Sequence, residues 1–397
     1  MGERTINDLR QMQGLPLHLK IELTKARLRQ WVNEWGEDGV YISFSGGKDS
    51  TVLLDIARSI YPSIRAVFVN TGLEYPEIVS FVQSFENVEI IKPEMNFKQV
   101  IKTYGYPFIS KEVSECVWGS RNYLADLRAQ ADRQTDSIVL DIRTSIENSV
   151  ELASMMDYRM RNGKGGANLR LARMLGTLTQ DNRVMPADRI PSNNRSKYAQ
   201  TKWKMFLRDD APLISSRCCA IMKKSPAHKY QRQTGRKVIT AEMASESRLR
   251  TQAWLKNGCN GFNTTTPKSM PMAFWTENDV LQYISEHNLP IASVYGEVVA
   301  CEDTTTSCPG QLRFVDTDMS IGESEVTYRT TGVSRTGCMF CGYGCHLEKS
   351  GEGRFLKMKK THPKQYEWIM KPCDDGGLGY KEVIDWINQN AGTHIEY

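Results

Sequence analysis

Residues 40–50 read VYISFSGGKDS. An apolar, β-branched run stops at a Ser-Gly-Gly-Lys-Asp-Ser turn, and the residues after it have the pattern of a helix. Two glycines let the backbone approach an anion closely, and the helix adds the positive end of its dipole. Lys48 supplies a compact positive charge, while Ser45 and Ser50 can donate hydrogen bonds to phosphate oxygens. The stretch therefore predicts a strand, a phosphate-binding turn and a helix, in that order.

The spacing of this turn excludes one familiar phosphate loop. A Walker A sequence has four residues between its first glycine and its Gly-Lys pair. Here the two glycines are adjacent and the lysine follows them directly. A different way of holding phosphate is needed.

Strand and helix patterns alternate on both sides of a long interruption. After one or two amphipathic helices in residues 5–36, the expected strands are 40–45, 65–70, 88–91 and 237–241, and the expected helices are 50–60, 76–85, 97–104, 226–233, 246–256 and 277–287, the last with Thr276 as its N-cap. This alternation predicts an α/β fold with a doubly wound, mostly parallel sheet covered by helices on both faces. Ligands of such sheets bind at the carboxyl ends of the strands, where the SGGKDS turn lies.

Changes of pattern divide the chain into five expected segments. These are N-terminal helices (1–36), a nucleotide-binding half (37–110), a basic, mostly helical insertion (111–208), the second half of the same domain (209–300) and a C-terminal region with a CxxC segment (301–397). The insertion is where the α/β alternation is lost.

Positive charge is concentrated in one stretch. The chain has 51 Lys and Arg against 46 Asp and Glu, a net charge of +5. Residues 151–208 hold twelve basic and four acidic side chains, a net +8, so the rest of the chain carries −3. Such a segment is typical of proteins that bind a polyanion, here nucleic acid or nucleotide. It is equally typical of a solvated surface. Tyr198 and Trp203 within it suit either base stacking or core packing.

No stretch of the sequence has the 18–20 consecutive apolar residues of a membrane span. The first residues, MGERTINDLRQMQ, are charged and lack the apolar core of a signal peptide. We therefore expect a cytoplasmic protein that does not bind membranes.

Ten cysteines in such a chain favour metal binding or catalysis over disulfides, because the cytosol keeps thiols reduced. Cys218 and Cys219 are adjacent, Cys338 and Cys341 form a CxxC pair, and Cys345 follows. Soft thiolates suit an iron–sulfur cluster or zinc.

Several motifs carry a resemblance to known proteins. SGGKDS resembles the signature of the pyrophosphate-loop ATPases, which grip the β and γ phosphates of ATP. NTGLEYPE (70–77), CCAIMKKSP (218–226), ASESRLR (244–250) and FWTENDVLQYISEHNLPIASVY (274–295) are similar to four ordered stretches of the phosphoadenosine phosphosulfate (PAPS) reductase family. The chain is thus identified as a member of that family, within the pyrophosphate-loop superfamily, which implies an α/β fold similar to that of the adenine nucleotide alpha hydrolases, together with sulfur chemistry.

The resemblance also implies roles for residues. ATP and Mg²⁺ would be held by Ser45, Gly46, Gly47, Lys48, Asp49, Ser50, Thr71 and Gly72, with Asp49 at the position tied to magnesium. The expected substrate-facing residues are Lys111, Lys223, Lys224, Glu246 and Arg250. A [4Fe–4S] cluster, with zinc as the alternative, would be ligated by Cys218, Cys219, Cys338 and Cys341. Lys48, Asp49 and Cys345 are the expected catalytic residues.

The unbroken SGGKDS turn favours ATP as the ligand, because sulfonucleotide reductases usually have a degraded loop. With its unbroken turn the chain is similar to the sulfur-incorporating component of DNA phosphorothioation systems and to the tRNA thiolases. The expected function is adenylation of a substrate, with nucleic acid favoured, followed by sulfur transfer through the cluster or a Cys345 persulfide from a donor such as a cysteine desulfurase. Two alternatives stay open: a PAPS or adenylyl-sulfate reductase that makes sulfite with thioredoxin, and a non-catalytic nucleotide-sensing or nucleic-acid-binding subunit. Against the reductase, Cys345 lies in YGCHLE and not in that family's ECGxH frame.

Overall fold

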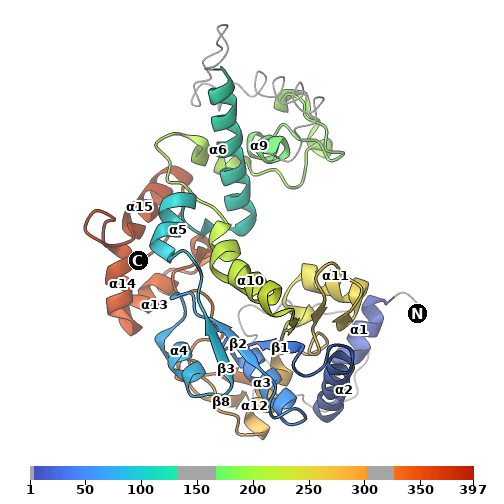
Figure 1. Ribbon diagram of the computed structural model, residues 1–397. Helices are drawn as coiled ribbons and strands as arrows, with labels where there is room; N and C mark the ends of the chain where they lie inside the picture. The colour runs from blue at the N-terminus through green and yellow to red at the C-terminus, as the bar shows by residue number, and fades with distance from the viewer. Residues whose placement is uncertain (1–3, 132–166, 302–325) are drawn as a thin grey trace. The chain divides into compact units, whose positions relative to one another are not determined.

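The computed structural model describes residues 4–131, 167–301 and 326–397 (Figure 1). Its internal contacts separate two compact units. The first unit comprises Met1–Glu94 and Lys223–Met339, and the second comprises Met95–Met222 and Phe340–Tyr397. The SGGKDS turn belongs to the first unit.

The first unit is built on a six-stranded sheet with the order β3-β2-β1-β5-β7-β6. Its strands are β1 (Val40–Ser43), β2 (Ala66–Val69), β3 (Val88–Ile91), β5 (Lys237–Ile239), β6 (Asn260–Gly261) and β7 (Lys268–Ser269). Neighbouring strands are parallel except for β6, which is antiparallel to β7. The predicted mostly parallel sheet is confirmed.

Alternating side chains of the central strands enter two different apolar clusters. Val40 and Ile42 lie in the large core, which also contains residues of the helices α2 (Leu17–Trp35), α3 (Lys48–Arg58) and α12 (Glu277–Glu286). Tyr41 points the other way and packs with Tyr230 of α10 (Ser225–Thr234). Because successive residues of a strand face opposite sides, helices cover both faces of the sheet, and the predicted doubly wound arrangement is confirmed.

Most predicted elements of this unit are present, with shifts at their ends. Its further helices are α1 (Ile6–Gln13), α4 (Pro76–Gln83) and α11 (Arg248–Asn257), and a hairpin is formed by β8 (Val298–Cys301) and β9 (Thr327–Thr330). The helix predicted at 50–60 begins at Lys48, so Lys48 and Asp49 lie in its first turn. Both side chains are therefore placed by helical geometry.

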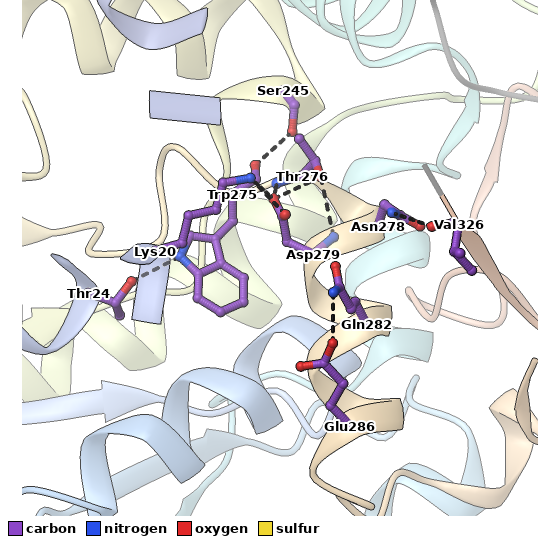
Figure 2. Close-up of polar contacts among 10 residues, drawn as sticks. All are labelled: Lys20, Thr24, Ser245, Trp275, Thr276, Asn278, Asp279, Gln282, Glu286 and Val326. Atoms are coloured by element: carbon purple, nitrogen blue, oxygen red, sulfur yellow. Dashed lines mark hydrogen bonds and ion pairs between the residues drawn. The ribbon is translucent and has the colours of Figure 1, made fainter. Parts of the chain in front are cut away.

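The N-terminus of α12 is anchored by a buried ion pair (Figure 2). Thr276 caps the helix as predicted, and the carboxylate of Asp279 accepts the Thr276 N–H in a capping box. The same carboxylate lies 2.7 Å from Nζ of Lys20 on α2, and both side chains are almost completely buried. Next to it, Trp275 donates from Nε1 to the Thr24 hydroxyl at 2.9 Å. The first turn of α12 is thus fixed against α2.

The second unit is mainly helical among its described residues. It contains α5 (Phe97–Tyr104), α6 (Lys111–Ala131), α9 (Ala167–Leu175), α13 (Arg354–Thr361), α14 (Pro363–Met370) and α15 (Tyr380–Ala391). Two short strands, β4 (Phe108–Ile109) and β10 (Gly342–Tyr343), pair in parallel. Phe108, Phe355 and Tyr380 are fully buried and pack as one aromatic group.

The basic segment is only partly within the described residues. Residues 151–166 lie outside them. In the remainder, Trp203 is buried and packs against Phe206, whereas Tyr198 is half exposed and has the cations of Arg173 and Lys197 over its ring. Trp203 is therefore a core residue and is not free to stack on a base.

None of the helices in the described parts of the chain combines the length and apolarity that crossing a membrane requires.

The buried ion pair makes a testable contribution to stability. Lys20→Met leaves the Asp279 carboxylate buried without its cation, which costs about 3–5 kcal/mol. We expect urea denaturation, followed by tryptophan fluorescence, to show a loss of that size. Lys25→Met is the control, because Lys25 forms a more exposed pair with Glu22 on the same helix, worth less than about 1 kcal/mol. Equal small losses for both variants would contradict the assigned role of Lys20.

Candidate functional site

A cavity of about 120 Å³ lies at the carboxyl ends of β1 and β5. The strand order runs outward from β1 to β2 and β3 on one side and from β5 to β7 on the other. Such a reversal is where parallel sheets bind their ligands. Five predicted residues line the cavity, namely Ser45, Gly47, Lys48, Asp49 and Glu246. Five further residues complete it, namely Met243, Glu277, Tyr295, Arg335 and Thr336.

The two glycines of the turn are required for different reasons. Gly46 has φ +70°, and a Cβ atom there would lie 2.7 Å from Val82 and 2.9 Å from Ile78 of α4. A side chain at Gly47 would lie 3.3 Å from the Tyr295 hydroxyl. Gly46 therefore lets the turn pack on α4, and Gly47 lets Tyr295 close over it.

The serine hydroxyls brace the turn from within. Ser50 donates from Oγ to the Gly47 carbonyl at 2.9 Å and accepts the Ser45 N–H at 3.2 Å. The hydroxyls of Ser45 and Ser50 lie 3.0 Å apart. Ser45 faces the cavity, whereas Ser50 is buried behind it. Of the two predicted phosphate donors, Ser45 is the one placed at the cavity wall.

Lys48 directs its charge into the cavity. Its side chain is only 4% exposed, and Nζ lies 2.9 Å from Oε1 of Glu277. The ammonium also lies 5.6 Å from the centre of the Tyr295 ring. Oε2 of Glu277 is 4.0 Å from Nη2 of Arg335. A carboxylate thus sits between two cations at the place where an anion was expected.

Asp49 lies beside this charge group. Burial raises the pKa of Asp49, Lys48 opposes the shift and Glu277 adds to it. A nearby cation would hold the Asp49 carboxylate in its ionised form. A carboxylate oxygen is also the ligand type that Mg²⁺ prefers. The position of Asp49 therefore fits the predicted magnesium role through its donor chemistry.

Tyr295 and Thr336 connect distant segments to the turn. The Lys48 N–H donates to the Tyr295 hydroxyl at 3.4 Å, and that hydroxyl is 2.5 Å from the hydroxyl of Thr336. The sequence reasoning missed both residues, together with Glu277 and Arg335. Glu277 and Tyr295 do lie in the quoted 274–295 motif, which was a usable signal. No sequence motif indicated Arg335 or Thr336.

The ASESRLR segment reaches the cavity through Glu246. Its carboxylate accepts the Met243 N–H at 3.0 Å and forms an ion pair with Arg250. Arg250 is not among the residues that line the described cavity. Its positive charge acts to lower the pKa of Asp49. The structure thus brings Glu246 to the cavity wall and places Arg250 as its partner.

Other predicted residues form a second group near the end of β2. The Thr71 hydroxyl donates to the Glu74 carboxylate at 2.8 Å, and Gly72 adopts φ +74° in the same turn. Nζ of Lys223 lies 3.9 Å from Oε1 of Glu74. Lys224 is the N-cap residue of α10. The lining of the described cavity does not include these four predicted residues.

Three of the predicted metal-ligating cysteines belong to the second unit. All three thiols lie near Tyr343. Burial is the main cause that raises the pKa of Tyr343, and the thiols of Cys218, Cys219 and Cys341 raise it further. Burial also raises the pKa of Cys341, and the charge of Lys111 at the start of α6 opposes that shift.

Cys338, the fourth predicted ligand, belongs to the first unit. In the described ranges, no three His, Cys, Asp or Glu side chains form a group that could hold a metal ion. The soft thiols suit an iron–sulfur cluster chemically. The four-cysteine ligand set stays a prediction.

Cys345 is buried in the second unit and held as a thiol. Its Sγ donates to the Gly342 carbonyl at 2.8 Å, and burial raises its pKa to about 12. The thiolate is the reactive form of cysteine. In this conformation Cys345 is a poor nucleophile at neutral pH.

Alkylation should reveal this protection. At pH 8 a thiol with a pKa of about 12 is ionised in roughly one molecule in ten thousand. We expect iodoacetamide to modify Cys345 at least about tenfold more slowly than exposed Cys373, as followed by peptide mass spectrometry. In urea the two rates should converge. Rapid modification of Cys345 in the folded protein would show that it is not buried as described.

A second test concerns the turn. Gly46→Ala imposes left-handed strain of about 1–2 kcal/mol and a collision with α4. Gly235→Ala is the matched control, because Gly235 has φ +73° and no described atom within 4 Å of an added Cβ. We expect the Gly46 variant to lose clearly more stability in urea denaturation than the Gly235 variant. Equal losses would mean that packing on α4 does not constrain the turn.

Comparisons with known proteins agree with the motifs. A family model described as the phosphoadenosine phosphosulfate reductase domain matches residues 39–117 and 183–342. An uncharacterized protein of Methanocaldococcus jannaschii is 34% identical over 70 residues, which are 16% of this chain and only 17% of that protein's length. The crystal structure of a phosphoadenylyl-sulfate (PAPS) reductase from Candida auris, in complex with phosphate, covers 74% of this chain and 91% of its own, with 13% identity and a TM-score of 0.33.

Proposed function

The chain belongs to the phosphoadenosine phosphosulfate reductase domain family, and we propose that it is an enzyme that binds ATP at the SGGKDS turn and adenylates a substrate for sulfur transfer. The observation that carries this proposal is the buried Lys48 ammonium, which enters a cavity at the reversal of strand order. A buried cation beside a helix N-terminus suits a leaving pyrophosphate. The turn is complete, which is expected of a protein that must expel pyrophosphate.

In the proposed reaction, Lys48, Asp49 and the backbone of the turn have different roles. An oxygen of the substrate attacks the α phosphorus of ATP, the bond to the bridging oxygen breaks, and pyrophosphate leaves. Lys48 neutralises the leaving charge, and the backbone of the turn orients it. Asp49 would hold Mg²⁺, which supplies further neutralisation when bound. A sulfur nucleophile then attacks the substrate atom that bears the adenylated oxygen, the bond between that atom and the oxygen breaks, and AMP departs with the oxygen.

The remaining cofactor and partner assignments are proposals of the same kind. Cys218, Cys219, Cys338 and Cys341 would ligate a [4Fe–4S] cluster, with zinc as the alternative; iron and sulfide analysis after anaerobic purification distinguishes the two. A cysteine desulfurase is the proposed type of sulfur donor. The basic segment 151–208 supports nucleic acid as the substrate class, in a cytoplasmic setting. No step of the mechanism depends on the cluster.

Pyrophosphate release tests the proposal directly. The anaerobically purified full chain is incubated with ATP, Mg²⁺, sulfide and candidate nucleic acids, and pyrophosphate is measured. We expect Lys48→Ala and Asp49→Ala each to lower the rate by about 100-fold or more, because each removes charge stabilisation of the transition state. Lys25→Ala, at a partly exposed ion pair, should keep the wild-type rate. Absence of pyrophosphate with every acceptor would refute adenylation.

A sulfonucleotide reductase is the second candidate, because the matching family model carries that description. It predicts sulfite release from PAPS or adenylyl sulfate with thioredoxin, lost in Cys345→Ser. A nucleotide-sensing subunit is the third, and it predicts ATP binding that survives Asp49→Ala without any turnover. Sulfite and pyrophosphate measured on the same preparation separate the three.

A further inference from the structure

We propose that Glu277 is an internal counterion that occupies the place of a phosphate group in the nucleotide-free cavity, and that Arg335 is the second cation of the same anion site. This inference rests on the proposed function, because it takes the SGGKDS cavity to be a phosphate site. It adds to that function a residue that opposes binding and a residue that selects the ligand. Neither residue belongs to the SGGKDS turn.

The geometry of the Glu277 carboxylate is that of a bridging anion. Oε1 is 2.9 Å from Nζ of Lys48, and Oε2 is 4.0 Å from Nη2 of Arg335. Lys48 is 4% exposed, so its charge needs a counterion in the absence of ligand. A phosphate that takes the position of this carboxylate beside Lys48 displaces Glu277 from that contact. Glu277 and the ligand therefore compete for one ammonium group.

The backbone of Glu277 is held in place, whereas its side chain is partly exposed. Glu277 is the first residue of α12, directly after the Thr276 cap, and the Lys20–Asp279 pair fixes this turn. Asn278 adds a bond to the Val326 carbonyl at 3.1 Å (Figure 2). The Glu277 side chain is 27% exposed and lies on the more open side of the pair. Displacement thus requires a change of side-chain rotamer and no movement of α12.

The size of the cavity agrees with displacement. Small-molecule sites usually measure about 300–1,000 Å³, and this cavity measures about 120 Å³. Opening the Lys48–Glu277 pair removes a carboxylate from its interior. The free energy spent on opening lowers the apparent affinity of every anion. A ligand that gains both Lys48 and Arg335 can offset that cost, whereas a small anion that reaches one cation cannot.

Discrimination between anions follows from the presence of two cations, because the cost of opening the Lys48–Glu277 pair is the same for every ligand. Pyrophosphate carries several charges along its length and can contact both cations, while inorganic phosphate is shorter. Arg335 should therefore favour pyrophosphate-containing ligands over phosphate, whereas Glu277 lowers the affinity of both. Arg335 is 63% exposed, which lets its side chain follow a ligand as it enters.

The test is a calorimetric titration of the full chain with inorganic pyrophosphate and with inorganic phosphate, without Mg²⁺. We expect Glu277→Gln to bind pyrophosphate and phosphate each at least about fivefold more tightly than wild type, because the same opening cost is removed for both ligands. Arg335→Gln should weaken pyrophosphate binding by about tenfold, in keeping with loss of one charge-assisted contact. Glu286→Gln is the matched control, because it makes the same change at the exposed far end of α12 and should leave both affinities unchanged. Circular dichroism checks that all variants are folded.

Other results would overturn the inference. Unchanged or weaker pyrophosphate binding by folded Glu277→Gln means that Glu277 does not compete with the ligand. Weaker binding seen only when Mg²⁺ is added means that Glu277 is a metal ligand. If wild type binds pyrophosphate and releases it from ATP while Glu277→Gln matches it, the inference fails and the proposed function stands. If neither protein binds pyrophosphate or ATP, both fail.

Discussion

The buried ammonium of Lys48 is the constraint around which the first unit arranges its ligand site. A charge removed from water is tolerated only beside an opposite charge or a strongly polar environment. Here the opposite charge is the Glu277 carboxylate and the ammonium also lies near the Tyr295 ring, whereas the N-terminus of α3 adds further positive charge. A cation buried in this position favours the binding of an anion. The proposed pyrophosphate leaving group is such an anion.

The fold brings the required groups together from separate parts of the sequence. β1 delivers the glycine turn, the segment after β5 delivers Glu246, and α12 delivers Glu277. The Lys20–Asp279 pair fixes the helix that carries Glu277 to the cavity. Lys20 on α2 therefore supports the position of Glu277 in the cavity through the buried ion pair.

Local sequence patterns predicted four of the six strands of the sheet, their parallel pairing, the helices that cover the sheet and the turn, because hydrophobic period and turn chemistry are properties of neighbouring residues. They missed the two-residue strands β6 and β7. The pattern placed the start of α3 two residues late, since helix ends are decided by capping and packing. It missed Arg335 and Thr336, whose approach to the turn depends on tertiary folding. For Trp203, composition left stacking and burial open, and only the packing against Phe206 decided between them.

Cys218, Cys219, Cys341 and Cys345 belong to a different compact unit from the turn, whereas Cys338 belongs to the same unit as the turn. The central claim concerns the turn. A crystal structure of the full chain with a non-hydrolysable ATP analogue tests it most directly. The account predicts the β and γ phosphates at residues 45–50, with Lys48 Nζ moved from Glu277 to a phosphate oxygen. A triphosphate bound elsewhere, with the Lys48–Glu277 pair intact, would contradict it.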